Sequence, residues 1–99
     1  MPYDMQMATR GYEELVLENY DQAEAFFDVA RSVNPYNPYV LLNLGVVYQN
    51  TGRIEDARRM YRQVIELNPT QRVDKSTEVQ HRGKSLADIA KINLANLEK

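Results

Sequence analysis

LGVVYQNTGRIEDARRMYRQVIELNP, residues 44–69, decides the fold, because its small and apolar residues recur at the spacing of a helix. Four residues here and just before share one helix face at i, i+3, i+4 and i+7: Leu41, Leu44, Gly45 and Tyr48. Asn37-Pro38 starts this helix, since Asn caps free N–H groups and Pro fits the first turn. Gly52 ends it, because glycine adopts the left-handed conformation that closes many helices.

A second helix follows directly and ends at a proline. Its apolar face comprises Ile54, Ala57, Met60, Tyr61, Val64 and Leu67. Asn68-Pro69 stops it, because the residue before a proline is disfavoured in the helical region. The stretch therefore predicts two consecutive helices joined by a short turn.

The same pair of helices occurs once before in the chain. A shift of 34, which we call the repeat period, matches Gly11 with Gly45, Ala23 with Ala57, Phe27 with Tyr61, Asn34 with Asn68 and Pro35 with Pro69. These matches fall at positions for close packing and chain breaks. Small residues at Gly11, Gly45, Ala23 and Ala57 would let the two helices of each pair approach closely.

A helix-turn-helix unit with a period of about 34 residues resembles the tetratricopeptide repeat family. The residues that carry the resemblance are Gly11, Ala23, Phe27, Pro35, Leu41, Leu44, Gly45, Tyr48, Gly52, Ala57, Tyr61 and Pro69. It implies an all-α fold of antiparallel helix-turn-helix repeats, a right-handed α-solenoid of about five helices. The first copy is degenerate: Glu14 stands where Tyr48 does, and Glu18-Asn19 replaces Thr51-Gly52. Its turn either differs or uses Asn19, since Asn tolerates the left-handed conformation.

The chain is interpreted as one domain, residues 1–99. Its parts are repeat 1 at about 4–37, repeat 2 at about 38–71, a polar linker at about 72–84 and a capping helix at about 85–98. Ser85 and Asp88 resemble a capping box at the start of that last helix. After an 11-residue insertion, Leu86, Ile89 and Ala90 take the places of Leu41, Leu44 and Gly45. The last helix is expected to cover the end of repeat 2.

Composition limits the chemistry. The 99 residues are 43% apolar and 26% charged, with net charge −2, no Cys and one His, so no disulfide, thiolate nucleophile or Cys-based metal site is available. His81 is expected at the surface, and no phosphate loop or nucleophile elbow is present. We therefore expect no enzyme activity, no cofactor and no metal.

Nucleic acid and membrane are not expected as partners. Arg58, Arg59 and Arg62 are interleaved with acids, and the pI is near 5.3, which disfavours a nucleic-acid surface. No segment is long and apolar enough to span a bilayer, and residues 1–10 do not read as a signal peptide. The expectation is a soluble protein, cytoplasmic or, with a signal outside this chain, periplasmic.

The resemblance further implies a concave groove lined by the first helix of each repeat. The groove residues are expected to be Met5, Ala8, Thr9, Tyr12, Leu15 and Val16 in repeat 1, and Tyr39, Leu42, Asn43, Val46, Gln49 and Asn50 in repeat 2. One subtype of this family binds the C-terminal carboxylate of a partner with Lys, Asn and Arg side chains at five positions. Only Asn43 and Lys84 match, while Ala8, Tyr12 and Asp88 replace the others, so contacts through apolar and amide groups are favoured.

The predicted function is a non-catalytic scaffold whose groove binds a peptide or helix of a partner protein. The alternative is an assembly module that self-associates as a homo-oligomer or stacks on further repeats of a longer chain. Residues 1–33 hold seven acids against two bases, and residues 70–99 hold six bases against four acids. Such asymmetry can steer association with a charged partner or with another copy head to tail. The favoured interpretation is nevertheless two solvated helix faces with a chance imbalance of charge. The last helix or a second chain filling the groove remains a further alternative.

Overall fold

The protein is all-α over the residues that its computed structural model describes, 3–67 and 83–98. The helices are α1 (Tyr3–Val16), α2 (Tyr20–Val33), α3 (Pro38–Asn50), α4 (Ile54–Leu67) and α5 (Leu86–Leu97). No strand occurs in these ranges. The predicted all-α fold of helix-turn-helix repeats is confirmed. Pro69 and residues 72–82 of the expected linker, including His81, lie outside the described residues.

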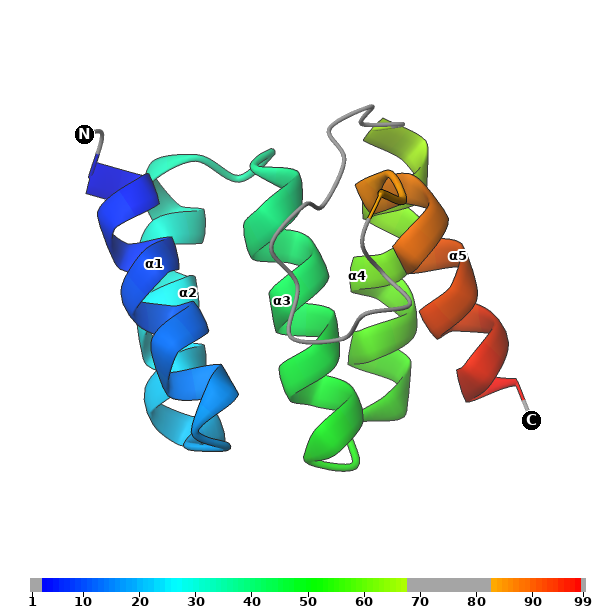
Figure 1. Ribbon diagram of the computed structural model, residues 1–99, viewed down its shortest axis with the longest axis horizontal. Helices are drawn as coiled ribbons and strands as arrows, with labels where there is room; N and C mark the ends of the chain where they lie inside the picture. Colours follow the sequence, from blue (N-terminus) through cyan, green and yellow to red (C-terminus); the bar gives the residue numbers. More distant parts are fainter. Residues whose placement is uncertain (1–2, 68–82, 99) are drawn as a thin grey trace.

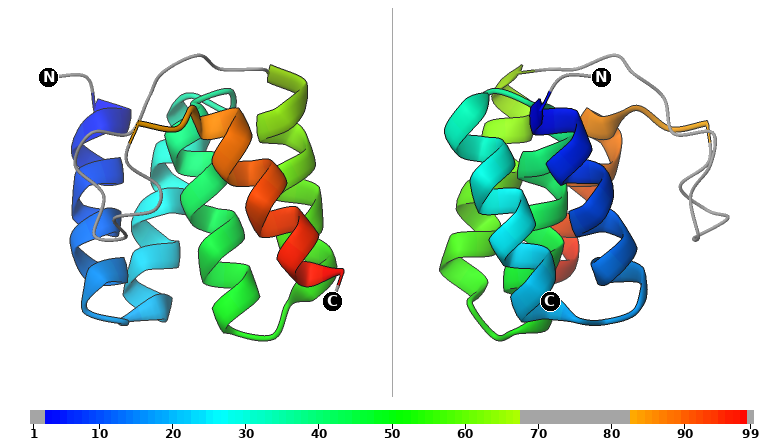
Figure 2. Two further views of the ribbon diagram at one scale, coloured as in Figure 1. Left: turned by 45° about the vertical axis from the view of Figure 1, so that its right-hand side comes forward. Right: turned by 90° about the vertical axis from the view of Figure 1, so that its left-hand side faces the viewer.

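The helices form two antiparallel hairpins and a fifth helix. α1 packs against α2 to form the first hairpin, α3 packs against α4 to form the second, and α5 packs mainly on α4. α1, α3 and α5 lie along one face of the array, with α2 and α4 along the other (Figures 1 and 2). α3 lies at the centre and contacts all four other helices.

The predicted helix starts are present. The Asn37 side-chain oxygen accepts a hydrogen bond from the Tyr39 backbone N–H at 3.0 Å, and Pro38 occupies the first turn of α3. The Ser85 hydroxyl oxygen accepts one from the Asp88 N–H at 3.1 Å. These side chains satisfy donors that have no partner within their own helix.

Each hairpin is held together by a glycine that touches an aromatic ring. A Cβ atom on Gly11 would lie 2.6 Å from Cε1 of Phe27, and one on Gly45 would lie 2.8 Å from Cδ1 of Tyr61 and closer still to Cε1. Phe27 and Tyr61 are fully buried, as are Ala23 and Ala57. The small residues therefore serve the close approach that the sequence predicts.

One core runs through all five helices. It contains Ala8, Ala23, Phe27, Ala30, Val40, Leu41, Leu42, Leu44, Val47, Tyr48, Ala57, Met60, Tyr61, Val64, Leu86, Ile89 and Ala90. α5 contributes the apolar face expected of it, since Leu86, Ile89 and Ala90 are all buried. α5 is thus an integral part of the domain.

A buried polar contact joins the two hairpins. The Asn37 side-chain N–H₂ donates to Oδ2 of Asp4 at 3.3 Å, and both residues are buried. The same amide group lies 3.2 Å from the Met5 sulfur. Because Asp4 lies in the first turn of α1 and Asn37 caps α3, this contact fixes the start of one hairpin against the start of the next.

The turn of the first hairpin differs from the expectation for Asn19. Glu18, rather than Asn19, takes the left-handed conformation, with φ 63°, while Asn19 has φ −86° and precedes α2. Glu18, and not Asn19, stands one repeat period before Gly52, whose φ is 80°. The alignment of Glu18-Asn19 with Thr51-Gly52 is therefore wrong by one residue. Chain geometry at this position is therefore the same in both hairpins, and the sequence departs from glycine only in the first.

Glu18→Gly is expected to stabilise the protein by about 0.5–1 kcal/mol. Glycine removes the clash of Cβ in the left-handed region, which outweighs the extra freedom it gives the unfolded chain. Thermal melts followed by circular dichroism measure the change. Glu13→Gly within α1 is the matched control and should lose about 1 kcal/mol. A loss of stability in both variants would contradict the strain at Glu18.

No helix within residues 3–67 or 83–98 combines the length and apolar character needed to cross a bilayer.

Candidate functional site

α3 leaves a single stripe of its surface open. The remaining helices cover most of this helix, and its buried residues are Val40, Leu41, Leu42, Leu44, Gly45, Val47 and Tyr48. The residues that keep exposed surface at helical spacing are Tyr39, Asn43, Val46 and Asn50. All four belong to the groove set predicted for the second hairpin.

α1 presents the equivalent stripe beside it. The matching positions one repeat period earlier are Met5, Thr9, Tyr12 and Val16, which are all exposed or half-buried. α1 and α3 contact each other on the same face of the array (Figure 1). We call these eight residues of α1 and α3 the uncharged stripe, because none of them is Asp, Glu, Lys, Arg or His.

Four other residues of the predicted groove set lie outside the uncharged stripe. Ala8 and Leu42 are only 7% exposed and belong to the core, so their assignment to an open groove is wrong. Each precedes Gly11 or Gly45 by three positions, which places it on the face that packs against the paired helix. Leu15 and Gln49 follow these glycines by four positions and are half-buried.

The stripe residues differ in how far their polar groups are already engaged. Thr9 Oγ1 donates to the Met5 carbonyl at 2.9 Å, and Asn50 Nδ2 donates to the Val46 carbonyl at 2.8 Å. Gln49, next to the stripe, accepts a hydrogen bond from the Tyr61 hydroxyl at 2.7 Å. Among the described residues, the Asn43 side chain has no hydrogen-bond partner. Asn43 therefore has the most available amide on this face.

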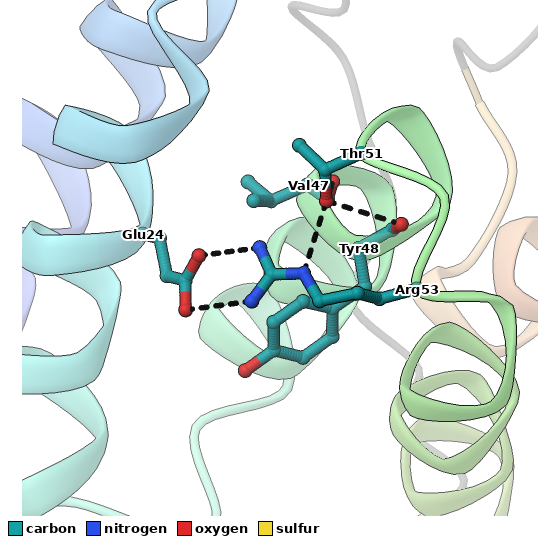
Figure 3. A network of polar contacts seen from close by, with 5 residues as sticks. All are labelled: Glu24, Val47, Tyr48, Thr51 and Arg53. Atoms are coloured by element: carbon teal, nitrogen blue, oxygen red, sulfur yellow. Dashed lines mark hydrogen bonds and ion pairs between the residues drawn. The ribbon is translucent and has the colours of Figure 1, made fainter.

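The interface between the two hairpins also contains an ion pair between Glu24 and Arg53, which the sequence pattern did not indicate. Nη1 and Nη2 of Arg53 donate to the Glu24 carboxylate at 3.1 and 2.5 Å, and Nε donates to Thr51 Oγ1 at 3.1 Å (Figure 3). The guanidinium carbon lies 4.6 Å from the centre of the Tyr48 ring. Arg53 therefore connects α2 to the end of α3, through two hydrogen bonds to Glu24 and through stacking of its guanidinium group on the Tyr48 ring. The two residues lie far apart in the chain, so no local pattern indicates such a pair.

An acid near this pair has a raised pKa. Burial, and then the negative charge of Glu24, raise the pKa of Asp28, while Arg31 and Arg53 oppose the shift. Burial likewise raises the pKa of Tyr48. Ionised Asp28 is thus less favourable in the folded than in the unfolded chain. The neutral form of Asp28 is therefore the form that favours folding. This stabilisation is fully present below the ordinary pKa of 3.8 and is lost as the pH rises through the raised pKa of Asp28 in the folded protein.

Asp28→Asn is expected to raise the melting temperature slightly at pH 7, because the uncharged amide avoids that cost. The gain should shrink as the pH falls toward about 3, where Asp28 itself is protonated. Melts at both pH values measure it. Asp21→Asn is the control, since Asp21 lies in the first turn of α2, where the helix dipole favours an acid. A gain for Asp28→Asn that grows on acidification would contradict the direction of the shift.

The family assignment follows from comparison with known proteins. A model of the tetratricopeptide repeat family matches residues 17–75, which is more than half of the chain. The chain belongs to the tetratricopeptide repeat family. Comparisons with curated proteins and with solved structures gave no match.

The matched segment of this tetratricopeptide repeat protein contains α2, α3 and α4. It includes the α3 half of the uncharged stripe and the Glu24–Arg53 pair. α1 lies before the matched segment and α5 after it. Proteins of this family generally serve in protein–protein interaction or as scaffolds. No group of three or more His, Cys, Asp or Glu side chains is placed to hold a metal in the described part of this repeat protein.

Proposed function

We propose that this protein is a non-catalytic interaction module that binds a peptide or helix of a partner protein along the uncharged stripe. The observation that carries the proposal is the open side of α3. A helix that is covered on its other sides leaves Tyr39, Asn43, Val46 and Asn50 open at helical spacing, in register with four residues of α1. Membership of the tetratricopeptide repeat family supports an interaction role.

The chemistry of the stripe indicates how it would hold a partner. Tyr39, 36% exposed, and Tyr12 offer contact area at low entropic cost, and Val46 offers apolar surface. The amide of Asn43 can donate to and accept from a peptide backbone. Since the stripe has no charge, binding should change little between roughly 0.05 and 0.5 M salt.

Tyr39→Ala with Asn43→Ala is expected to weaken binding at least about tenfold, because it removes the aromatic anchor and the available amide. The probe is a peptide selected from a random library against the wild-type protein, with affinity measured by titration calorimetry. Amide NMR shifts on binding should fall on α1 and α3.

Asp21→Ala with Gln22→Ala on exposed positions of α2 is the matched control and should leave affinity unchanged. Circular dichroism must show that both double variants keep their helices. Unchanged affinity in the Tyr39 and Asn43 variant, with shifts on α2 and α4, would overturn the proposal.

The rival proposal is self-association by stacking of hairpins, and the outer face of α1 argues against it. Val40, Leu44 and Val47 of α3 are fully buried. Their counterparts one repeat period earlier are Gln6, Arg10 and Glu13, and all three are exposed. A polar outer face offers little apolar area to another hairpin. Light scattering over a concentration series tests this, and a mass that rises with concentration would favour the rival.

A further inference from the structure

Two ion pairs connect consecutive parts of the array. Between the first and second hairpins, Glu24 of α2 pairs with Arg53, which follows α3. Between the second hairpin and α5, Nε of Arg58 on α4 lies 3.2 Å from Glu98, the residue that caps the end of α5. Arg58 also pairs with Glu55 within α4.

These pairs occupy equivalent places. Glu24 and Arg58 are separated by one repeat period. The step from Arg53 to Glu98 equals the step that places Leu86 on Leu41 and Ala90 on Gly45. At each junction, the second helix of one hairpin therefore meets a residue that follows the first helix of the next unit. The charges are reversed between the two junctions. At the first, the second helix of the hairpin carries the acid, Glu24, and at the second it carries the base, Arg58.

We infer that this reversal of polarity specifies the order in which the units stack. α5 placed against α2 would bring Glu98 next to Glu24, so that two acids face each other. The α3 end of a second copy placed against α4 would bring Arg53 next to Arg58, so that two bases face each other. Each wrong contact is repulsive and each native contact attractive, which favours one register and one order.

The size of the effect follows from exposure. The four side chains are between 18% and 55% exposed, so solvent weakens both attraction and repulsion. The pairs therefore act by discriminating against stackings that place like charges together. Exchanging one pair should therefore change the proportion of wrong assemblies about threefold.

The test compares full-length chains that refold from denaturant. Glu24→Arg with Arg53→Glu keeps an attractive pair at the first junction but gives both junctions the same polarity. α4 can then accept either its own α5 or the α3 end of a second copy. We expect about three times as much oligomer as in wild type, measured by size-exclusion chromatography with light scattering.

A second variant provides the control by exchanging both pairs, adding Arg58→Glu and Glu98→Arg. The junctions again have opposite polarity, so its oligomer fraction should return to that of wild type. Equal fractions in all three proteins would overturn the inference. Both variants lose the contacts of Arg53 with Tyr48 and Thr51 equally, so that loss does not account for a difference between them. Failure of the first variant to fold while the second folds would also overturn the inference.

Discussion

Gly45→Leu should lower the melting temperature of the protein by roughly 15 °C. Tyr61 is fully buried, and its ring lies where even the Cβ of residue 45 would be placed. A leucine side chain must displace the ring and break its hydrogen bond to Gln49. Overpacking of this kind costs about 3 kcal/mol or more, a large part of the stability of a domain of this size.

Gly45→Ala separates packing from helix propensity. Alanine favours a helix over glycine by about 1 kcal/mol, whereas the clash with Tyr61 costs about 1–3 kcal/mol. The clash should dominate, so this variant is also expected to be less stable. Circular dichroism melts compare it with Asn50→Ala at the exposed end of α3. A melt of Gly45→Leu that coincides with that of wild type would refute the glycine–aromatic contact.

Asn37→Ala should be the second most damaging change, with a loss of about 2–4 kcal/mol. The substitution removes the cap of α3, worth about 1 kcal/mol. It also leaves the buried Asp4 without the amide that donates to it, at a cost of about 1–3 kcal/mol. The two losses fall on the same side chain because Asn37 uses its oxygen for α3 and its N–H₂ for α1.

Asn34→Ala provides the matched control for this effect. Asn34 is exposed, and its side-chain oxygen accepts a hydrogen bond from the Tyr36 N–H at 3.2 Å. Its loss should cost well under about 1 kcal/mol, because water replaces that bond. Urea unfolding of both variants gives the free energies. Equal losses would show that burial of the Asp4–Asn37 contact adds nothing.

The sequence predicted the helices and the close contacts well, since both depend on local spacing. Gly11, Gly45, Ala23 and Ala57 recur at the repeat period, and each meets the packing demand that this period implies. The caps at Asn37 and Ser85 were also predictable, because a cap acts within three positions of itself.

The sequence alone did not predict contacts that cross between units. Arg53 and Glu24 are 29 apart in the chain, and Asp4 and Asn37 are 33 apart, so neither pair forms a periodic pattern. The groove set was partly wrong for a related reason. Ala8 and Leu42 each directly precede a residue of the uncharged stripe in the chain. Only the orientation of each helix about its axis decides which of the neighbouring positions is covered.

The central place of α3 also determines how the domain fluctuates. A helix that contacts every other helix cannot open unless most of the core separates, so its amides should exchange with solvent only through global unfolding. α1 and α5 lie at the two ends of the array and should exchange through smaller openings. We therefore expect the α3 half of the uncharged stripe to lie on the most protected backbone among the five described helices. A partner that docks there would lose little affinity to ordering the protein, because folding has already supplied that order.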